Sequence, residues 1–83
     1  MTDLQTTELD AVIREVLAET FGLDVAAIPV TASNQTVADW DSLGQISLVF
    51  ALEQRFGVAI DIEHIASMQS FARIREVLGA LVG

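Results

Sequence analysis

Apolar and polar positions along the chain follow a pattern that predicts three main helices separated by irregular segments. In the first stretch, apolar residues recur at intervals of three and four: Leu9, Val12, Ile13, Val16, Leu17 and Phe21. This spacing places them on one face of a helix. Thr6 or Thr7 can cap its start. Glu8 and Asp10 follow in the first turn, where acidic side chains are favourable, and Gly22 is a suitable C-terminal stop.

Residues 23–41 break this pattern and are predicted to form a long loop. Pro29 and the polar run Ser33–Thr36 argue against a long helix, although a short turn near Val25–Ile28 fits. A loop of this length in a small domain is often functional. It carries several apolar residues that can pin it to the helices, so we expect it to be packed: Leu23, Ile28, Val30, Val37 and Trp40.

Residues Ser42–Phe56 are predicted to form the second helix, ended by Gly57. Its core stripe consists of Leu48, Leu52 and Phe56, with Ala51 beside them. A second apolar row runs along the same helix: Leu43, Ile46 and Phe50, with Val49 close to it. A helix in a small bundle needs only one apolar stripe. The second row is therefore either covered by the loop and neighbouring helices, which the pattern slightly favours, or exposed as a docking surface for proteins.

The C-terminal third is predicted to contain a connector, a short helix and a last long helix. Val58–Ile60 is apolar, but no second strand signal exists to pair with it, so we expect an extended connector. Asp61 can cap a brief helix over Ile62–Ala66, and Ser67 can cap a last helix over Met68–Leu81. The apolar face of that helix is Phe71, Ile74, Val77, Leu78 and Leu81, with Arg73, Arg75 and Glu76 mostly outside. The predicted fold is an all-α bundle of three main helices plus one short helix.

Composition narrows the possible functions. The 83 residues fit a single domain, 1–83, in which about residues 1–6 form a loose N-terminal end, and 52% hydrophobic content allows a compact core. Without cysteine, the chain has no disulfide, thiolate zinc site or cysteine nucleophile, and one histidine, His64, cannot by itself make a metal site. The net charge of −8 disfavours binding to nucleic acid or anionic membranes. The acidic start is unlike a signal segment, so we expect a cytoplasmic protein.

The candidate chemistry lies at the start of the second helix, where Asp41 and Ser42 follow the long loop. Either side chain can cap free backbone N–H groups, and on these residues alone a simple cap is the favoured interpretation. A helix start also attracts anions such as phosphate, which suits a serine that receives a phosphate-linked group. A catalytic triad of Ser42, His64 and an aspartate is not predicted, because no G-x-S-x-G motif surrounds the serine. We expect no catalytic residues.

The run from Asp39 to Ile60, DWDSLGQISLVFALEQRFGVAI, resembles the acyl carrier protein family. The motif Asp41-Ser42-Leu43 is followed by L-V-x-A-L-E-x-x-F-G at Leu48–Gly57, and the resemblance covers essentially the whole domain. It implies that Ser42 carries a 4'-phosphopantetheine arm, joined as a phosphodiester by a transferase that uses coenzyme A, with Asp41 as its motif neighbour. The arm's thiol would hold acyl groups as thioesters, which explains how a chain without cysteine handles thiol chemistry.

The resemblance also implies partners. They include a phosphopantetheinyl transferase, an acyl-loading ligase or transferase, and a ketosynthase or other thioester-processing enzymes, all acting on a monomeric, non-catalytic carrier. The expected docking residues lie on the second helix: Leu43, Ile46, Val49, Phe50 and Glu53.

The second helix departs from the pattern of carriers for general fatty acid synthesis. It has Gly44, Gln45 and Ser47 where acids are often found, and Glu53 is its only acid. This favours a free-standing carrier in polyketide, specialised fatty acid or other secondary-metabolite biosynthesis. The alternatives are a peptidyl carrier, although its Gly-Gly signature before the serine is absent, and an unmodified helical interaction module.

Overall fold

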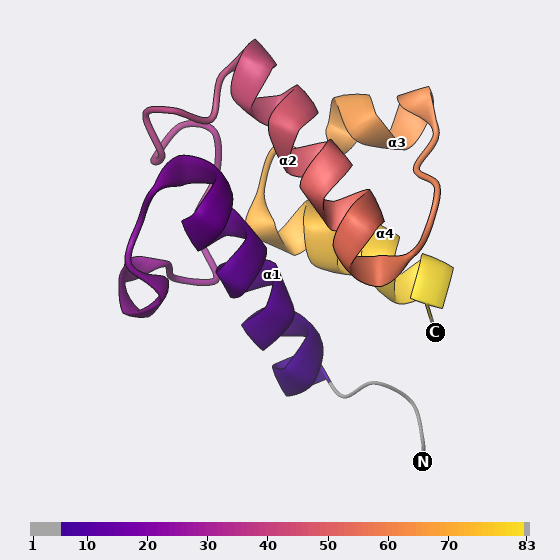
Figure 1. Cartoon of the computed structure of the whole chain (residues 1–83), viewed down its shortest axis with the longest axis horizontal. Helices are drawn as coiled ribbons and strands as arrows, with labels where there is room; N and C mark the ends of the chain where they lie inside the picture. Colours follow the sequence, from indigo (N-terminus) through magenta and orange to yellow (C-terminus); the bar gives the residue numbers. More distant parts are fainter. Residues whose placement is uncertain (1–5, 83) are drawn as a thin grey trace.

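The computed structural model describes residues 6–82, and the side chains of residues 8–81 (Figure 1). The elements in chain order are α1 (Thr6–Phe21), a short 3-10 helix η1 (Val25–Ala27), α2 (Ser42–Phe56), α3 (Ile62–Ser67) and α4 (Phe71–Val82). The described residues contain no strand, only an isolated bridge between Ser33 and Ser70. The predicted all-α bundle of three main helices plus a short one is confirmed. The predicted loose end and the proposed caps Thr6 and Thr7 lie outside the residues or side chains described.

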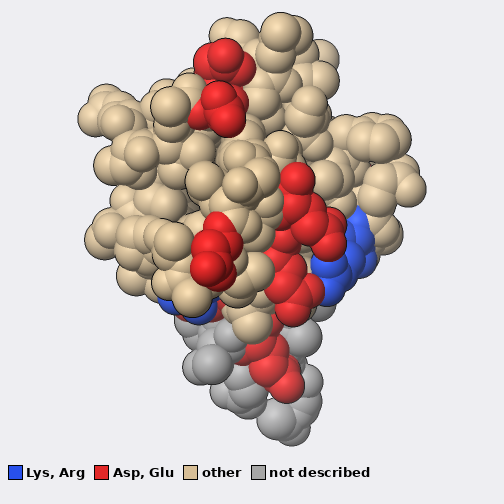
Figure 2. Space-filling model, turned by 60° about the vertical axis from the view of Figure 1, so that its left-hand side comes forward, with Lys and Arg blue, Asp and Glu red and all other residues tan. Residues whose placement is uncertain are grey.

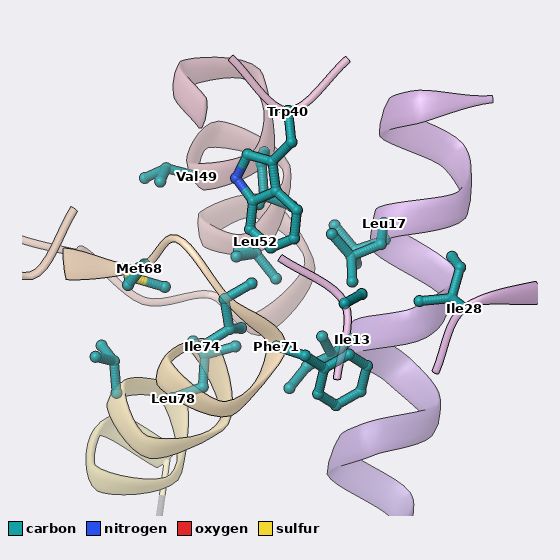
Figure 3. Packing of buried hydrophobic residues seen from close by; sticks show 14 of the residues in the cluster. Ile13, Leu17, Ile28, Trp40, Val49, Leu52, Met68, Phe71, Ile74 and Leu78 are labelled. Carbon is teal, nitrogen blue, oxygen red and sulfur yellow. The ribbon is translucent and has the colours of Figure 1, made fainter. Parts of the chain in front are cut away.

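The core lies where α1 packs against α2 and α4. Figure 3 shows Leu17 of α1, Leu52 of α2 and Phe71 of α4 within this shared interior. The predicted α1 stripe is buried, apart from the partly buried Val12. On α4 the predicted face is buried except for Leu81 in the last turn, which is exposed. The helix periodicity thus located most of the core correctly.

Both predicted glycine stops are confirmed. Gly22 and Gly57 have φ angles of 67° and 66°, in the left-handed region that glycine adopts without a steric penalty. The N–H of Gly57 donates to the carbonyl of Glu53 at 2.9 Å, which satisfies one of the last free carbonyls of α2. The chain therefore turns away sharply at the ends of α1 and α2, and this starts the long loop and the connector.

The long loop is packed on the helices, but through fewer side chains than expected. Trp40 is buried and stacks on Phe21 at the end of α1, with ring centroids 5.7 Å apart. Ile28 is also buried, and its carbonyl accepts a 2.9 Å hydrogen bond from Nε of Arg14. The predictions that Leu23 and Val30 pin the loop are wrong, because both are at least 40% exposed. The small residue Ala32 is buried instead and brings the loop backbone close to the core.

The last helix begins three residues later than predicted, and Ser70 replaces Ser67 as its cap. The N–H of Arg73 donates to Oγ of Ser70, whereas Ser67 is the last residue of α3. The difference arises from pairing with the loop: the N–H of Phe71 donates to the carbonyl of Ala32 at 2.9 Å. A backbone that pairs with the loop here cannot also continue a helical hydrogen-bond ladder.

Arg75, predicted to lie mostly outside, is only partly exposed, with 35% of its side chain accessible. Its Nε and Nη2 donate to the two carboxylate oxygens of Asp10 at 2.8 and 2.9 Å, so that α4 is clamped to α1. Asp10 is buried, although the sequence suggested only a favourable place in the first turn of α1. The hydrogen bonds that Arg75 donates to Asp10 hold the Arg75 pKa above its usual value. A buried carboxylate needs such a partner.

The segment between α2 and α4 agrees with the sequence. Residues 58–60 belong to no helix or strand and form no bridge, which fits a connector, and the side chain of Ile60 is buried. Asp61 caps α3 by accepting a 2.9 Å hydrogen bond from the N–H of His64. Among the described residues, none of the helices has both the length and the apolar character needed to cross a bilayer.

Candidate functional site

Asp41 and Ser42 at the start of α2 have different tasks. Asp41 is the N-cap, because its Oδ1 accepts a 2.9 Å hydrogen bond from the N–H of Gly44 and its carbonyl accepts one from Gln45 at 2.7 Å. Ser42 is the first helical residue and is exposed. Within residues 6–82 its hydroxyl has no hydrogen-bond partner. The cap therefore leaves the serine available for chemistry.

A polar cavity of about 370 Å³ adjoins Ser42. Its lining comes from the loop, the start of α2 and the segment before α4: Asn34, Trp40, Asp41, Ser42, Gln45 and Gln69. The loop and the segment before α4 are joined by a 3.0 Å hydrogen bond from the N–H of Asn34 to the carbonyl of Gln69. Within the described residues, the backbone N–H groups of Ser42 and Leu43 have no acceptor. The helix start therefore offers two donors to an anion beside an exposed hydroxyl.

Gln45 fixes the position of this helix start. Its Oε1 accepts a 2.6 Å hydrogen bond from the indole N–H of Trp40, which can only donate. Its Nε2 donates to the carbonyls of Ile65 and Met68 at 2.7 and 2.9 Å. One amide thus joins the loop, α2 and the end of α3. The sequence did not reveal this role, since two of the partners lie 20 and 23 positions away.

Gly44 allows the loop to pass very close to the first turn of α2. A Cβ at this position would lie 2.2 Å from the backbone oxygen of Asp39 and 2.9 Å from the Phe21 ring. Both distances are shorter than atoms can approach without displacement. A glycine is therefore required for this close approach, and no side chain fits between the loop and the helix.

The second apolar row of α2 is exposed, except for one member. Leu43, Ile46 and Phe50 are 76%, 64% and 63% exposed, which rejects the covered arrangement. Val49 is only 4% exposed and belongs to the core, so its predicted place on the docking surface is wrong. Val49 is three residues from both Ile46 and Leu52, and spacing alone did not decide which side it joins.

Glu53, also predicted as a docking residue, has an internal role. Its Oε2 accepts a 2.8 Å hydrogen bond from the N–H of Ile60, in a partly buried position. The carboxylate therefore holds the connector against α2. Since Glu53 is the only acid of α2, the exposed row contains no acidic side chain of its own.

His64 lies apart from Ser42. Its Nδ1 is 2.8 Å from Oδ1 of Asp61, and it lines a surface hollow with Arg73 and Glu76, whereas Ser42 lines the cavity described above. The pKa of Asp61 is lowered, chiefly by the hydrogen bond from the backbone N–H of His64. The structure thus does not assemble a triad around Ser42. Within the described part of the chain, no three His, Cys, Asp or Glu residues gather as metal ligands do.

A family model described as "Phosphopantetheine attachment site" matches residues 11–81, which is most of the chain. The chain belongs to this family. It is therefore a carrier domain of the acyl carrier type and bears covalent 4'-phosphopantetheine. Carriers of this family are served by a phosphopantetheinyl transferase and by enzymes that process thioesters. The family expected from the DSL motif and the helix that follows it is confirmed.

Proposed function

We propose that Ser42 is the residue that holds the 4'-phosphopantetheine arm, and that the carrier presents acyl thioesters to partner enzymes without catalysing a reaction itself. The observation that carries this proposal is the unengaged Ser42 hydroxyl at the start of α2. Asp41 performs the capping that a serine here would otherwise perform. The hydroxyl is therefore exposed to a transferase at no cost to the helix.

The surroundings of Ser42 suit a phosphodiester. The backbone N–H groups of Ser42 and Leu43 are without acceptors among the described residues, and the helix start favours negative charge. The adjoining cavity is also lined by Asn34 and Gln69, whose side-chain amides can donate to phosphate oxygens. When bound, the arm supplies the thiol that carries the acyl group. The chain's own residues orient the phosphate and keep its attachment point at the surface.

The exposed row of Leu43, Ile46 and Phe50 supports a docking role for α2. Three large apolar side chains, each more than 60% exposed, follow Ser42 along one side of the helix. An exposed apolar patch of this kind is typical of a protein contact. A partner enzyme that covers this row would lie directly beside the attachment serine. Val49 and Glu53 are not part of this proposed surface, since both have internal contacts.

We further propose that the carrier serves polyketide, specialised fatty acid or other secondary-metabolite biosynthesis. The exposed row of α2 is apolar. Glu53, the one acid of α2, accepts a hydrogen bond from the connector. Partners that recognise this helix therefore rely on apolar contact more than on basic patches. This supports a dedicated set of partner enzymes rather than those of general fatty acid synthesis.

Intact mass measurement tests the attachment site. The chain is incubated with coenzyme A and a broad-specificity phosphopantetheinyl transferase, and we expect a single gain equal to one phosphopantetheine group. Ser42→Ala should abolish this gain. Ser47→Ala removes another exposed hydroxyl of α2 and should leave it unchanged. Absence of a gain, or a gain that persists in Ser42→Ala, would overturn the assignment.

A further inference from the structure

The long loop forms an apolar groove that is separate from the cavity at Ser42. The groove has a volume of about 410 Å³, and its lining includes Leu23, Ala27, Pro29, Ala32, Val37 and Asp39. None of these residues lines the cavity beside Ser42. We call this feature the loop groove.

The loop groove is surrounded by apolar side chains that the core does not use. Leu23, Val25 and Val30 are 41%, 44% and 40% exposed, although the sequence suggested that two of them anchor the loop. Leu23 lines the groove and Val30 follows the lining residue Pro29, whereas Val25 stands two positions from the lining residues Leu23 and Ala27. Exposed apolar residues gathered around a hollow are typical of a binding surface.

The groove is preformed by hydrogen bonds within the loop. The N–H of Ala27 donates to the carbonyl of Asp24 at 2.8 Å, and the N–H of Ala32 donates to that of Pro29 at 3.0 Å. The N–H of Val37 donates to the carbonyl of Ser33 at 3.0 Å. A groove held in this way requires little ordering when a ligand binds, so more of the contact energy contributes to affinity.

The charge beside the groove is negative. Asp39 lines the groove, and Asp24 stands between Leu23 and Val25, where its Oδ1 is held by the N–H of Ala26. Neither aspartate has an ion pair within the described residues. Arg14 lies beneath the loop, where its Nε donates to Ile28 and its guanidinium lies over Phe71. Figure 2 shows a face of the molecule with acidic residues spread over it and basic residues at its margins.

We propose that the loop groove docks a peptide segment of a partner protein that carries one large apolar side chain flanked by arginine or lysine. The apolar side chain fills the groove, and its basic neighbours face Asp24 and Asp39. Asp39 is three residues from Ser42, a separation of at most roughly 11 Å along an extended chain. A partner held here therefore stays within reach of the attachment site and leaves the exposed row of α2 open to another contact.

Selection from a displayed library of random peptides against the immobilised full chain tests this proposal. We expect enriched peptides with a single large apolar residue between basic residues. In a titration followed by NMR, they should shift the resonances of Leu23, Ile28, Val30 and Val37. Binding should weaken with added salt, because charge pairs at a surface are screened.

Paired variants separate the charge effect from folding. The double variant Asp24→Asn and Asp39→Asn keeps side-chain shape and capping ability, and should weaken binding by about tenfold. The matched double variant Glu19→Gln and Glu63→Gln removes the same charge away from the groove and should leave binding within about twofold. Leu23→Ser should also weaken binding, with circular dichroism melting used to verify folding.

Three results would overturn the proposal. The enriched peptides could lack basic residues, they could bind both double variants equally, or their shifts could map to Leu43, Ile46 and Phe50. A fourth contrary result would be that an octanoyl group loaded on the arm shifts the groove resonances and excludes the peptides, which would make the groove a cargo site. The peptide test uses the unmodified chain, so its failure leaves the mass test of Ser42 unaffected.

Discussion

Gln45 is the residue at which the loop, α2 and α3 are joined. Its amide satisfies one donor, the Trp40 indole, and two acceptors, the carbonyls of Ile65 and Met68. A glutamate of nearly the same size keeps the acceptor but loses both donors. An acid at this position would therefore place negative charge against two carbonyl oxygens. The amide at this position is explained by internal hydrogen bonding.

We expect Gln45→Glu to lower the free energy of unfolding by about 2–4 kcal/mol, because two partly buried carbonyls lose their donor and face a carboxylate. Urea unfolding followed by circular dichroism measures this change. Ser47→Glu introduces the same charge at an exposed position of α2 and should change stability by less than about 0.5 kcal/mol. Equal effects of the two substitutions would contradict the structural role of Gln45.

Gly44, like Gln45, stands at a position of α2 where an acid was expected, and packing explains the glycine. Any side chain at this position meets the backbone of Asp39, since a Cβ would lie 2.2 Å from its oxygen. The sparse acidity at the start of α2 thus reflects the close packing of the loop as well as the choice of partners. Of the three positions that depart from the acidic pattern, Gly44, Gln45 and Ser47, the first two are therefore explained by internal contacts.

At the scale of elements, α2 has a core side and a solvent side that are both apolar. Leu48, Val49 and Leu52 are buried, whereas Leu43, Ile46 and Phe50 are exposed. The hydrophobic effect stabilises the fold through the first set only. The second set contributes little to stability, and this supports the proposed contact of this row with a partner enzyme.

We expect Ile46→Glu to reduce partner-enzyme kcat/KM for the loaded carrier by about tenfold, the effect of losing roughly 1.4 kcal/mol of contact. Its free energy of unfolding should change by less than about 1 kcal/mol, because the side chain is exposed. Val49→Ala, in the core of the same helix, should cost about 1–3 kcal/mol of stability. If Ile46→Glu destabilises the fold as much as Val49→Ala does, the exposed row is structural.

The cap of α3 gives the protein a predictable response to acid. The Asp61 pKa is lowered from its ordinary value of 3.8, chiefly by the hydrogen bond from the N–H of His64. Its ionised form therefore favours the folded state, fully so above the unfolded pKa. This contribution is lost as the pH falls through the lowered folded pKa.

The variant Asp61→Asn keeps an oxygen that can cap α3 but removes the carboxylate that titrates. We expect the native protein to be the more stable of the two at about pH 6, and the difference to shrink towards about pH 3. Urea unfolding of both proteins at several pH values measures it, and the shared carboxylates cancel in the difference. A difference that stays constant or grows on acidification would show that the Asp61 carboxylate does not favour folding.

At the scale of the whole molecule, the first and last helices, α1 and α4, are tied together by Asp10 and Arg75. These residues are 65 positions apart and form a two-pronged ion pair between α1 and α4. Asp10 is buried and the pair lies beside Phe71, whose ring the Arg75 guanidinium covers at 5.7 Å. With this geometry, the pair should contribute more to the free energy of unfolding than the exposed pair of Arg55 and Glu15.

Asp10→Asn should therefore destabilise the fold by about 1–3 kcal/mol, because Arg75 loses a charged acceptor in a partly buried place. Glu15→Gln breaks the exposed pair with the same change of charge and shape, and should cost less than about 0.5 kcal/mol. Thermal unfolding at low salt compares the two variants. Similar melting temperatures for both would mean that the clamp between α1 and α4 contributes little.

The sequence by itself determined the helices, most of the buried stripes and the place of Asp41 and Ser42 at the start of α2. These features follow from residues three or four positions apart, whose spacing reports directly on a helix face. The family, and with it the phosphopantetheine group, followed from a motif that lies within one helix and the residues before it. All this information is local in the chain.

Only the tertiary structure decided which residues connect the elements and which remain exposed. It placed Val49 in the core, moved the start of α4 to Phe71 and left Leu23 and Val30 at the surface. The roles of Gln45 and of the pair Asp10 and Arg75 depend on partners 20 to 65 positions away. Periodicity carries no information at that range, because those contacts exist only once the helices and the loop have packed together.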